Sequence, residues 1–159
     1  MLIDNKTAFD NTARQTVYNF LKNKTGAGKF DLVSGFFSVP ILARMLDEIN
    51  QPEEIRMILG NLLQDKEGPS KIADLISGEL NIDAVLKLNS VAEKAIHFLE
   101  QEKVKLKTVE SSFCHAKTYI YHDHNNSSLN YHIVGSSNLT EAGLGLRDSS
   151  NIELNQALT

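Results

Sequence analysis

The spacing of apolar residues predicts alternating helices and strands in the first 60 residues. Val17, Phe20 and Leu21 recur at helical intervals. The run FDLVSGFFSV is apolar on both faces, as in a central strand that is covered on both sides. Ser38 and Pro40 then form a typical helix start. The expected elements are a helix at 7–24, a strand at 30–39, a helix from Ser38 to about residue 50 and a strand at 54–60.

The second half of the chain is predicted to contain one well-marked helix and several strands. Ser90 and Glu93 fit a capping box at the start of a helix whose apolar stripe includes Ala95 and Phe98. Two apolar runs joined by the polar HDHNNSSLN predict a long hairpin. The expected elements are a loop at 65–70 and a short helix after it, a helix at 90–103, a Gly-rich turn at 141–146, and strands at 104–109, 113–121, 131–138 and 150–156.

This order of elements indicates an α/β fold, with a mixed, mostly parallel β-sheet flanked by helices. The strand, helix and strand between residues 30 and 60 favour parallel neighbours. A chain of 159 residues with 42% hydrophobic and 23% charged residues fits a single globular domain over 1–159. A polar N-terminus, short apolar runs and one cysteine predict a cytoplasmic protein without a membrane partner.

The net charge of −4 argues against a protein that binds nucleic acid over its whole surface, but it allows a local positive site. The segment KTGAGK at 24–29 does not supply that site as a P-loop. The P-loop pattern requires Gly at 23 and Ser or Thr at 30, where this chain has Asn23 and Phe30. The segment is therefore predicted to be an ordinary turn.

The predicted hairpin gathers groups that suit an anion. Side chains alternate along a strand, so His115, Lys117, Tyr119 and Tyr121 share one face. The alternate residues lie on the other face, which is expected to be the core side: Cys114, Ala116, Thr118 and Ile120. On the next run the same alternation pairs a serine and an amide, Ser136 and Asn138. An isolated His-x-Lys is typical of solvated residues, whereas the whole set in register predicts an anion site.

The hairpin carries HAK and then GSSN, followed by NIELN. These runs resemble the signature of the phospholipase D superfamily, in which His-x-Lys precedes Gly-Ser-x-Asn. SGFFS and IVGSSNLTEAGL further resemble the phospholipase D-like domains of bacterial helicases, where they are N-terminal, and of restriction nucleases. The resemblance covers roughly residues 30–156 and implies a phospholipase D-like half-domain. The family's Asp, five residues after the Lys, is His122 here, and Asp123 comes one position later.

The resemblance implies a phosphodiesterase of the nuclease type, a hydrolase that works through a phosphohistidine on His115. It implies that a carboxylate, Glu153, orients this imidazole, and that Lys and Asn side chains stabilise the charge that forms on the phosphoryl oxygens. No metal ion or other cofactor is then expected. The expected catalytic residues are His115, Lys117 and Glu153, and the expected phosphate-binding residues are Lys117, Gly135, Ser136 and Asn138. His122, Asp123 and His124 resemble metal ligands, but a turn rich in Asn and Ser is more often simply solvated.

The reaction uses two histidines, and this chain carries one His-x-Lys. Two copies related by a twofold axis would complete the site, so a homodimer is expected. The leading hypothesis is a DNA phosphodiesterase domain, the N-terminal module of a helicase or of a restriction system, with helicase domains in the same longer chain. The alternative is a catalytically weak module that binds nucleic-acid phosphate. A phospholipid-processing enzyme is disfavoured because no membrane-binding segment is evident.

Overall fold

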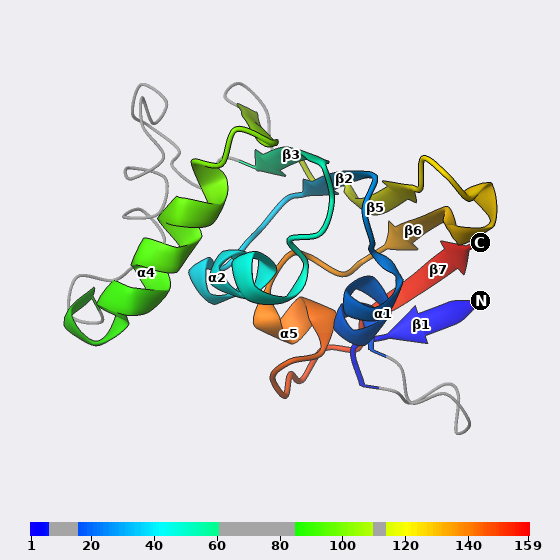
Figure 1. The fold of residues 1–159 in the computed structure, drawn as a ribbon. Helices are drawn as coiled ribbons and strands as arrows, with labels where there is room; N and C mark the ends of the chain where they lie inside the picture. Colours follow the sequence, from blue (N-terminus) through cyan, green and yellow to red (C-terminus); the bar gives the residue numbers. More distant parts are fainter. Residues whose placement is uncertain (7–15, 61–84, 110–113) are drawn as a thin grey trace.

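The computed structural model describes residues 1–6, 16–60, 85–109 and 114–159, which fold around one seven-stranded sheet (Figure 1). The strand order is β1-β7-β6-β5-β2-β3-β4. The strands are β1 (Leu2–Asp4), β2 (Lys29–Ser34), β3 (Glu54–Gly60), β4 (Val104–Val109), β5 (Lys117–His122), β6 (Tyr131–Gly135) and β7 (Leu154–Leu158). The helices are α1 (Val17–Lys24), α2 (Val39–Glu48), α4 (Val85–Leu99), α5 (Glu141–Leu144) and the short 3₁₀ turn η2 (Ser127–Leu129).

The sheet is mixed, as expected, but the expectation that it is mostly parallel is wrong. β2, β3 and β4 run parallel, whereas the pairs β2–β5, β5–β6, β6–β7 and β1–β7 are antiparallel. A parallel pair needs a long crossover connection, while a short turn between neighbouring strands reverses direction. The hairpin from β5 to β6 and the return into β7 therefore make the C-terminal half antiparallel.

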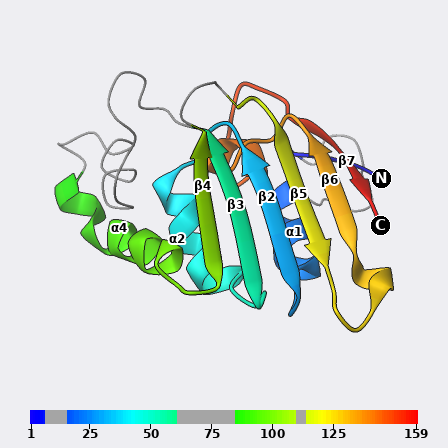
Figure 2. The same cartoon turned by 90° about the horizontal axis from the view of Figure 1, so that it is seen from above.

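The described helices lie on one face of the sheet, and Figure 2 looks at the other face. In β2, Phe30, Leu32 and Ser34 are buried beneath the helices, while Asp31 and Val33 point to the opposite face and are half-buried. The expectation that β2 is covered on both sides is not met within the described residues, where alternate positions differ in exposure. We call the face without described helices the open face.

Several boundaries match the predicted elements. β3 and β4 span the expected residues. α1 ends at the expected residue 24 and buries Val17, Phe20 and Leu21, but it begins at Val17 after the cap Thr16, and residues 7–15 of the expected helix lie outside the described residues. The helix α2 follows Ser38, but the hydroxyl of Ser38 makes no capping hydrogen bond. The strand β2 ends at Ser34, before its expected end at 39, because the chain turns away at Gly35 to reach α2. The loop expected at 65–70 and the short helix after it lie outside the described residues.

Other boundaries were predicted wrongly. α4 begins at Val85, so Ser90 lies inside the helix and the expected capping box is wrong. Its apolar stripe is confirmed, since Ala95, Phe98 and Leu99 are buried. The closing strand begins at Leu154 rather than at residue 150. The short strand β1 was not predicted; it pairs with β7 and adds an edge to the sheet.

Candidate active site

Four chain segments meet at one end of the sheet. This edge is formed by the ends of the strands and not by an outer strand. The end of β2 lies beside the start of β5, where Ser34 pairs with Lys117. The end of β6 reaches the same edge and lies beside the start of β7, where Gly135 pairs with Asn155. Because β5, β6 and β7 alternate in direction, this edge gathers the regions that hold all the residues predicted for the site.

The face carrying Lys117, Tyr119 and Tyr121 is the buried face, which reverses the sequence-based assignment of the core side. Tyr119 and Tyr121 are 0% and 1% exposed, whereas Thr118 and Ile120 are half-buried on the open face. The tyrosine hydroxyls explain the reversal, because each finds a hydrogen-bond partner inside the protein: Tyr119 donates to the Ser137 carbonyl and Tyr121 to the Ala27 carbonyl. The large rings can therefore pack beneath the helices.

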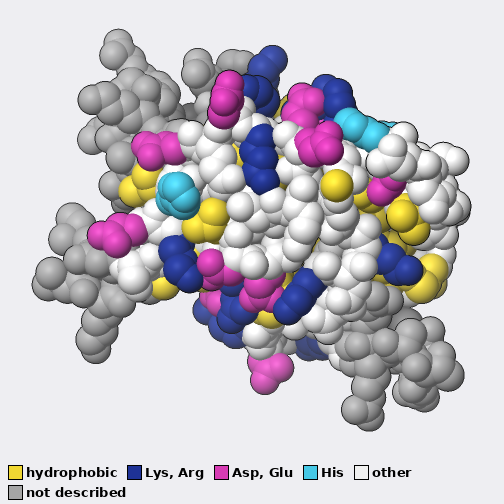
Figure 3. Space-filling model, in the orientation of Figure 1, with side chains coloured by type: hydrophobic (Ala, Val, Ile, Leu, Met, Phe, Trp, Pro, Cys, Tyr) yellow, Lys and Arg dark blue, Asp and Glu magenta, His cyan; other side chains and the backbone are white. Residues whose placement is uncertain are grey.

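Lys117 is 6% exposed, and its ammonium donates a 2.6 Å hydrogen bond to the carbonyl oxygen of His115. Among the residues that the structure describes, no carboxylate lies within ion-pair distance of this nitrogen. An ammonium ion has three donors and loses favourable hydration when buried. Lys117 therefore forms a local positive centre, although acidic and basic side chains are interspersed over the face shown in Figure 3. His115, which precedes β5, is exposed.

Asn138 is held by the segment that follows β2. Its Oδ1 accepts a hydrogen bond from the Phe36 amide at 3.1 Å and lies 3.5 Å from the Ser34 hydroxyl oxygen, whose proton is donated to the Phe36 carbonyl. Ser34 is fully buried, and its hydroxyl oxygen accepts a hydrogen bond from the Leu139 amide at 2.8 Å. Because Oδ1 is occupied, the side-chain NH₂ group of Asn138 is the part that can donate to an anion.

Ser136 and Gly135 contact β7 directly. The Ser136 hydroxyl accepts the Leu154 amide at 3.0 Å, and the Ser136 amide donates to the Leu154 carbonyl at 3.2 Å. The hydroxyl proton can still be donated to an anion. A Cβ at Gly135 would lie 2.4 Å from the Leu154 carbonyl and from the Asn155 side chain. Packing against β7 thus requires glycine at this position, and contact of Gly135 with a phosphate stays a prediction.

Glu153 lies immediately before β7, and Asn5 holds its backbone. The Asn5 Oδ1 accepts the Glu153 amide at 2.9 Å, while the Asn5 Nδ2 donates to the carbonyls of Ala142 and Asn151 at 2.9 and 3.3 Å. Burial raises the pKa of Tyr119, and the negative charge of Glu153 raises it further. The Glu153 carboxylate is therefore close enough to influence the buried face of β5. Its pairing with His115 stays a prediction.

Sequence reasoning missed Ser34, Asn5 and Asn155, three buried polar residues that join the segments of the site. Asn155 is 1% exposed. Its Oδ1 accepts a hydrogen bond from the Ser137 amide, and its Nδ2 donates one to the Ser137 hydroxyl. The signal for Ser34 was a polar residue at a core position of an apolar strand. Ser136 and Asn138 were expected on one strand, but β6 ends at Gly135 and both follow it.

His122, Asp123 and His124 lie at the opposite end of β5 from the candidate site. The Asp123 Oδ1 accepts the amides of Asn125 and Asn126, both at 2.8 Å, and its Oδ2 accepts the Tyr121 hydroxyl at 3.0 Å. These hydrogen bonds lower the pKa of Asp123 and organise the turn. No group of three or more potential metal ligands occurs in the described part of the chain.

Comparisons with known proteins identify the class of this fold. The sequence from 24 to 159 matches a family described as "Cardiolipin synthase, PLD-like domain". The chain therefore belongs to the phospholipase D-like family. No curated protein sequence matches it significantly. None of the described helices is long and apolar enough to cross a membrane.

A solved structure of yeast tyrosyl-DNA phosphodiesterase is similar to this chain, with a TM-score of 0.56 and 14% identity over 99% of this chain and 31% of that protein. A mutant of yeast tyrosyl-DNA phosphodiesterase 1 gives a TM-score of 0.48 and 14% identity over 86% of this chain and 27% of that one. The first similarity shows a shared fold. The chain spans less than a third of the length of these solved proteins.

Proposed function

We propose that this domain is a phosphodiesterase of the nuclease type that cleaves DNA through a phosphohistidine on His115. The observation that carries the proposal is Lys117. The residue is 6% exposed, and its ammonium has no carboxylate partner among the described residues, at the sheet edge where the exposed His115 lies. A buried charge is costly unless something compensates it, and a phosphate group would do so.

In the first step, a ring nitrogen of His115 attacks phosphorus and forms a P–N bond, while the bond to the leaving oxygen breaks. The electron pair of the broken bond goes to that oxygen, which takes a proton from a second imidazole. Lys117, Ser136 and Asn138 donate hydrogen bonds to the non-bridging oxygens as their negative charge grows. The carboxylate of Glu153 accepts the other N–H of His115 and fixes the ring.

In the second step, water attacks the phosphohistidine, the P–N bond breaks and the nitrogen regains its electron pair. The second imidazole, now neutral, accepts the proton of the attacking water. We propose that this imidazole is His115 of a second copy, placed across a twofold axis. The positive groups of two copies would then face one phosphate, although the chain as a whole carries a net charge of −4.

DNA is the proposed substrate, and a helicase or restriction system is the proposed context. The match of residues 24–159 to the phospholipase D-like family supports phosphodiester chemistry. The similar solved structure is of an enzyme whose name specifies a DNA phosphodiester. The proposed context rests on the resemblance of SGFFS and IVGSSNLTEAGL to domains linked to helicases and restriction nucleases. A cytoplasmic location is proposed with it.

The deciding experiment is cleavage of end-labelled DNA by the wild-type chain, the His115→Ala variant and the His97→Ala variant. His97 is an exposed histidine on α4, so its substitution controls for the loss of an imidazole elsewhere. We expect cleavage that His97→Ala retains and His115→Ala loses. DNA binding without cleavage in all three proteins would contradict the enzyme and support the phosphate-binding module.

Cleavage should persist in excess EDTA, because side chains supply the charge stabilisation that metal ions supply in other nucleases. If EDTA abolishes activity and a divalent ion restores it, the phosphohistidine mechanism as written is wrong. The assay should use highly purified protein, since a contaminating metal-dependent nuclease would give the same loss. The His115→Ala variant, purified in parallel, provides that control.

The proposed dimer can be tested by sedimentation and by mixing variants. His115→Ala chains mixed with Lys117→Ala chains should not regain full activity, because every mixed site still lacks one imidazole and one ammonium. A strictly monomeric wild-type chain that cleaves DNA would refute the shared site. Sedimentation of the same samples measures the oligomeric state directly.

A further inference from the structure

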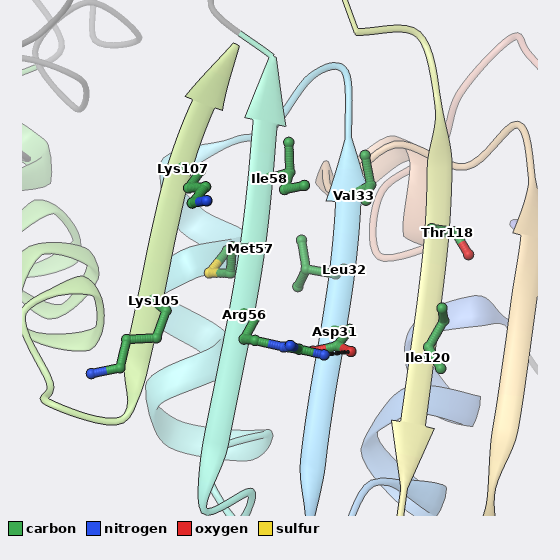
Figure 4. Close-up of a pocket in the computed structure, with 10 residues that line it drawn as sticks. All are labelled: Asp31, Leu32, Val33, Arg56, Met57, Ile58, Lys105, Lys107, Thr118 and Ile120. Carbon is green, nitrogen blue, oxygen red and sulfur yellow. Dashed lines mark hydrogen bonds and ion pairs between the residues drawn. The ribbon is translucent and has the colours of Figure 1, made fainter.

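The open face of the sheet carries a shallow apolar groove over β2 and β3 (Figure 4). Its volume is about 310 Å³. Val33, Ile58 and Ile120 project from three neighbouring strands into this region, and Ile58 is 39% exposed. Further exposed apolar residues on this face, Val134 and Leu158, are 45% and 52% exposed. In the strand register, Thr118 and His132 separate Val134 and Leu158 from the groove, so the contiguous apolar surface is the groove itself. Contiguous apolar surface marks an interaction site more often than isolated exposed residues do.

Charge is arranged asymmetrically around the groove. Arg56 and Asp31 form a two-pronged ion pair across β2 and β3, with N–O distances of 2.6 and 2.5 Å, so their charges compensate each other. Lys105 and Lys107 of β4 are exposed on one side of the groove; the Lys105 side chain points away from β3, and its ammonium donates a 2.6 Å hydrogen bond to the Glu102 carbonyl. Neither lysine has a carboxylate within ion-pair distance in the described part of the chain. The β4 side of the groove is therefore positively charged.

The dimensions of the groove fit a helix. Lysines of β4 form one side and Thr118 and Ile120 of β5 the other, with β3 and β2 between them. Three strand spacings of about 4.8 Å separate β4 from β5, a span of about 14 Å. An α-helix with its side chains is about 10–12 Å across. Helices are also the usual cover for the face of a sheet, whereas an added strand pairs with an edge.

The groove is less suited to nucleic acid. Single strands bind where aromatic rings stack on the bases, and the residues that line this groove include no aromatic side chain. A phosphate backbone requires a track of cations, but the groove's arginine is already paired with Asp31 and both of its lysines lie on β4, at one side only. The apolar floor instead favours a partner that contributes apolar side chains.

We propose that the open face is a docking site for an amphipathic helix of a partner protein that has an acidic flank. The apolar stripe of that helix packs on Val33, Ile58 and Ile120, and its acidic residues lie on the β4 side, nearest to Lys107 and with Lys105 at the outer margin. This surface is separate from the edge that holds His115 and Lys117. The proposal does not depend on catalysis, so its test needs no activity.

The test uses two labelled synthetic helical peptides of about 15 residues, long enough to span a strand of six residues. Both carry the same leucine stripe at helical spacing, and the residues flanking the stripe are glutamate in one and lysine in the other. Binding to the 159-residue chain is measured by fluorescence anisotropy. We expect the glutamate peptide to bind about tenfold more tightly than the lysine peptide. The Lys105→Glu, Lys107→Glu double variant should reverse that preference.

Ile58→Asp should weaken binding of the glutamate peptide about tenfold, as loss of a central apolar contact does. Leu129→Asp is the matched control, because Leu129 is 47% exposed in the β5–β6 connection and lies away from the groove. Ile58→Thr, which keeps a branched strand residue, replaces Ile58→Asp if the aspartate prevents folding. Equal binding of both peptides, or an equal loss with Leu129→Asp, overturns the proposal. Self-association abolished by Ile58→Asp also overturns it, because a second copy would then occupy the groove.

Discussion

Lys117→Met should have opposite effects on stability and on anion binding. The substitution removes a buried ammonium and keeps a long unbranched side chain. It loses the 2.6 Å hydrogen bond to the His115 carbonyl, a bond of the charged type that contributes about 1.5–3 kcal/mol. It also removes the desolvation cost of the charge, which is several kcal/mol. We therefore expect the free energy of unfolding to rise by about 1 kcal/mol.

For a chain of this size, a gain of that amount raises the melting temperature by about 2–4 °C. Added phosphate should stabilise the wild type more than Lys117→Met. A ligand that binds only the folded state stabilises it by about 1.4 kcal/mol when its concentration is ten times its Kd. The wild type should show this stabilisation and Lys117→Met should lose most of it. Both effects are measured by thermal unfolding with and without phosphate.

Lys107→Met is the matched control, since Lys107 is an exposed lysine on β4 without an ion pair among the described residues. It should leave both the melting temperature and the phosphate effect close to those of the wild type. A loss of more than about 2 kcal/mol in Lys117→Met, with the phosphate effect retained, would refute the reasoning. Lys117 would then be a structural residue whose charge is compensated inside the protein.

Three further substitutions test the supports of the site. Asn5→Ala removes three hydrogen bonds from a residue that is 5% exposed, so it should lower the free energy of unfolding, measured in urea, by about 2–3 kcal/mol. The control Asn19→Ala, on the exposed side of α1, should change this free energy little. Gly135→Ala should destabilise the protein by at least about 2 kcal/mol in the same assay, because its Cβ would clash with the backbone of β7; a smaller loss would show that β7 can shift. The pKa of Asp123 is lowered, first by the Asn125 amide, so its stabilising effect is present above pH 3.8 and is lost as the pH falls below that value. The destabilisation caused by Asp123→Asn, measured at pH 7 and again at pH 3, should therefore shrink at the lower pH.

Local sequence patterns predicted the interior strands well, because each is long enough to show its periodicity. β3 was predicted from Glu54 to Gly60, and the structure has the same bounds. β1 has only three residues and depends on pairing with β7, which begins 150 residues later, so no local pattern could predict it. The serine and glutamate at 90 and 93 fit a helix start, but they lie inside α4, which begins at Val85, so a capping signal alone does not determine where a helix begins.

The candidate site was predictable in its chemistry and less so in its supports. Strand alternation placed Lys117 and Tyr119 on one face correctly, but it could not tell which face the helices cover. Side chains such as Ser34 and Asn5 act through partners more than 100 positions away, as in the contact of Ser34 with Asn138. Contacts over such distances follow from the strand order, which the sequence pattern did not determine.

These long-range contacts have a consequence for how the protein folds. Asn5 and Glu153 are 148 positions apart, and Ser34 and Asn138 are 104 apart, yet both pairs border the same sheet edge. Closing such large loops is entropically costly, and proteins rich in distant contacts fold slowly. The anion site can therefore form only late, when both ends of the chain have joined the sheet. During refolding, recovery of phosphate binding should coincide with the last kinetic phase, so a bound anion would report that folding is complete.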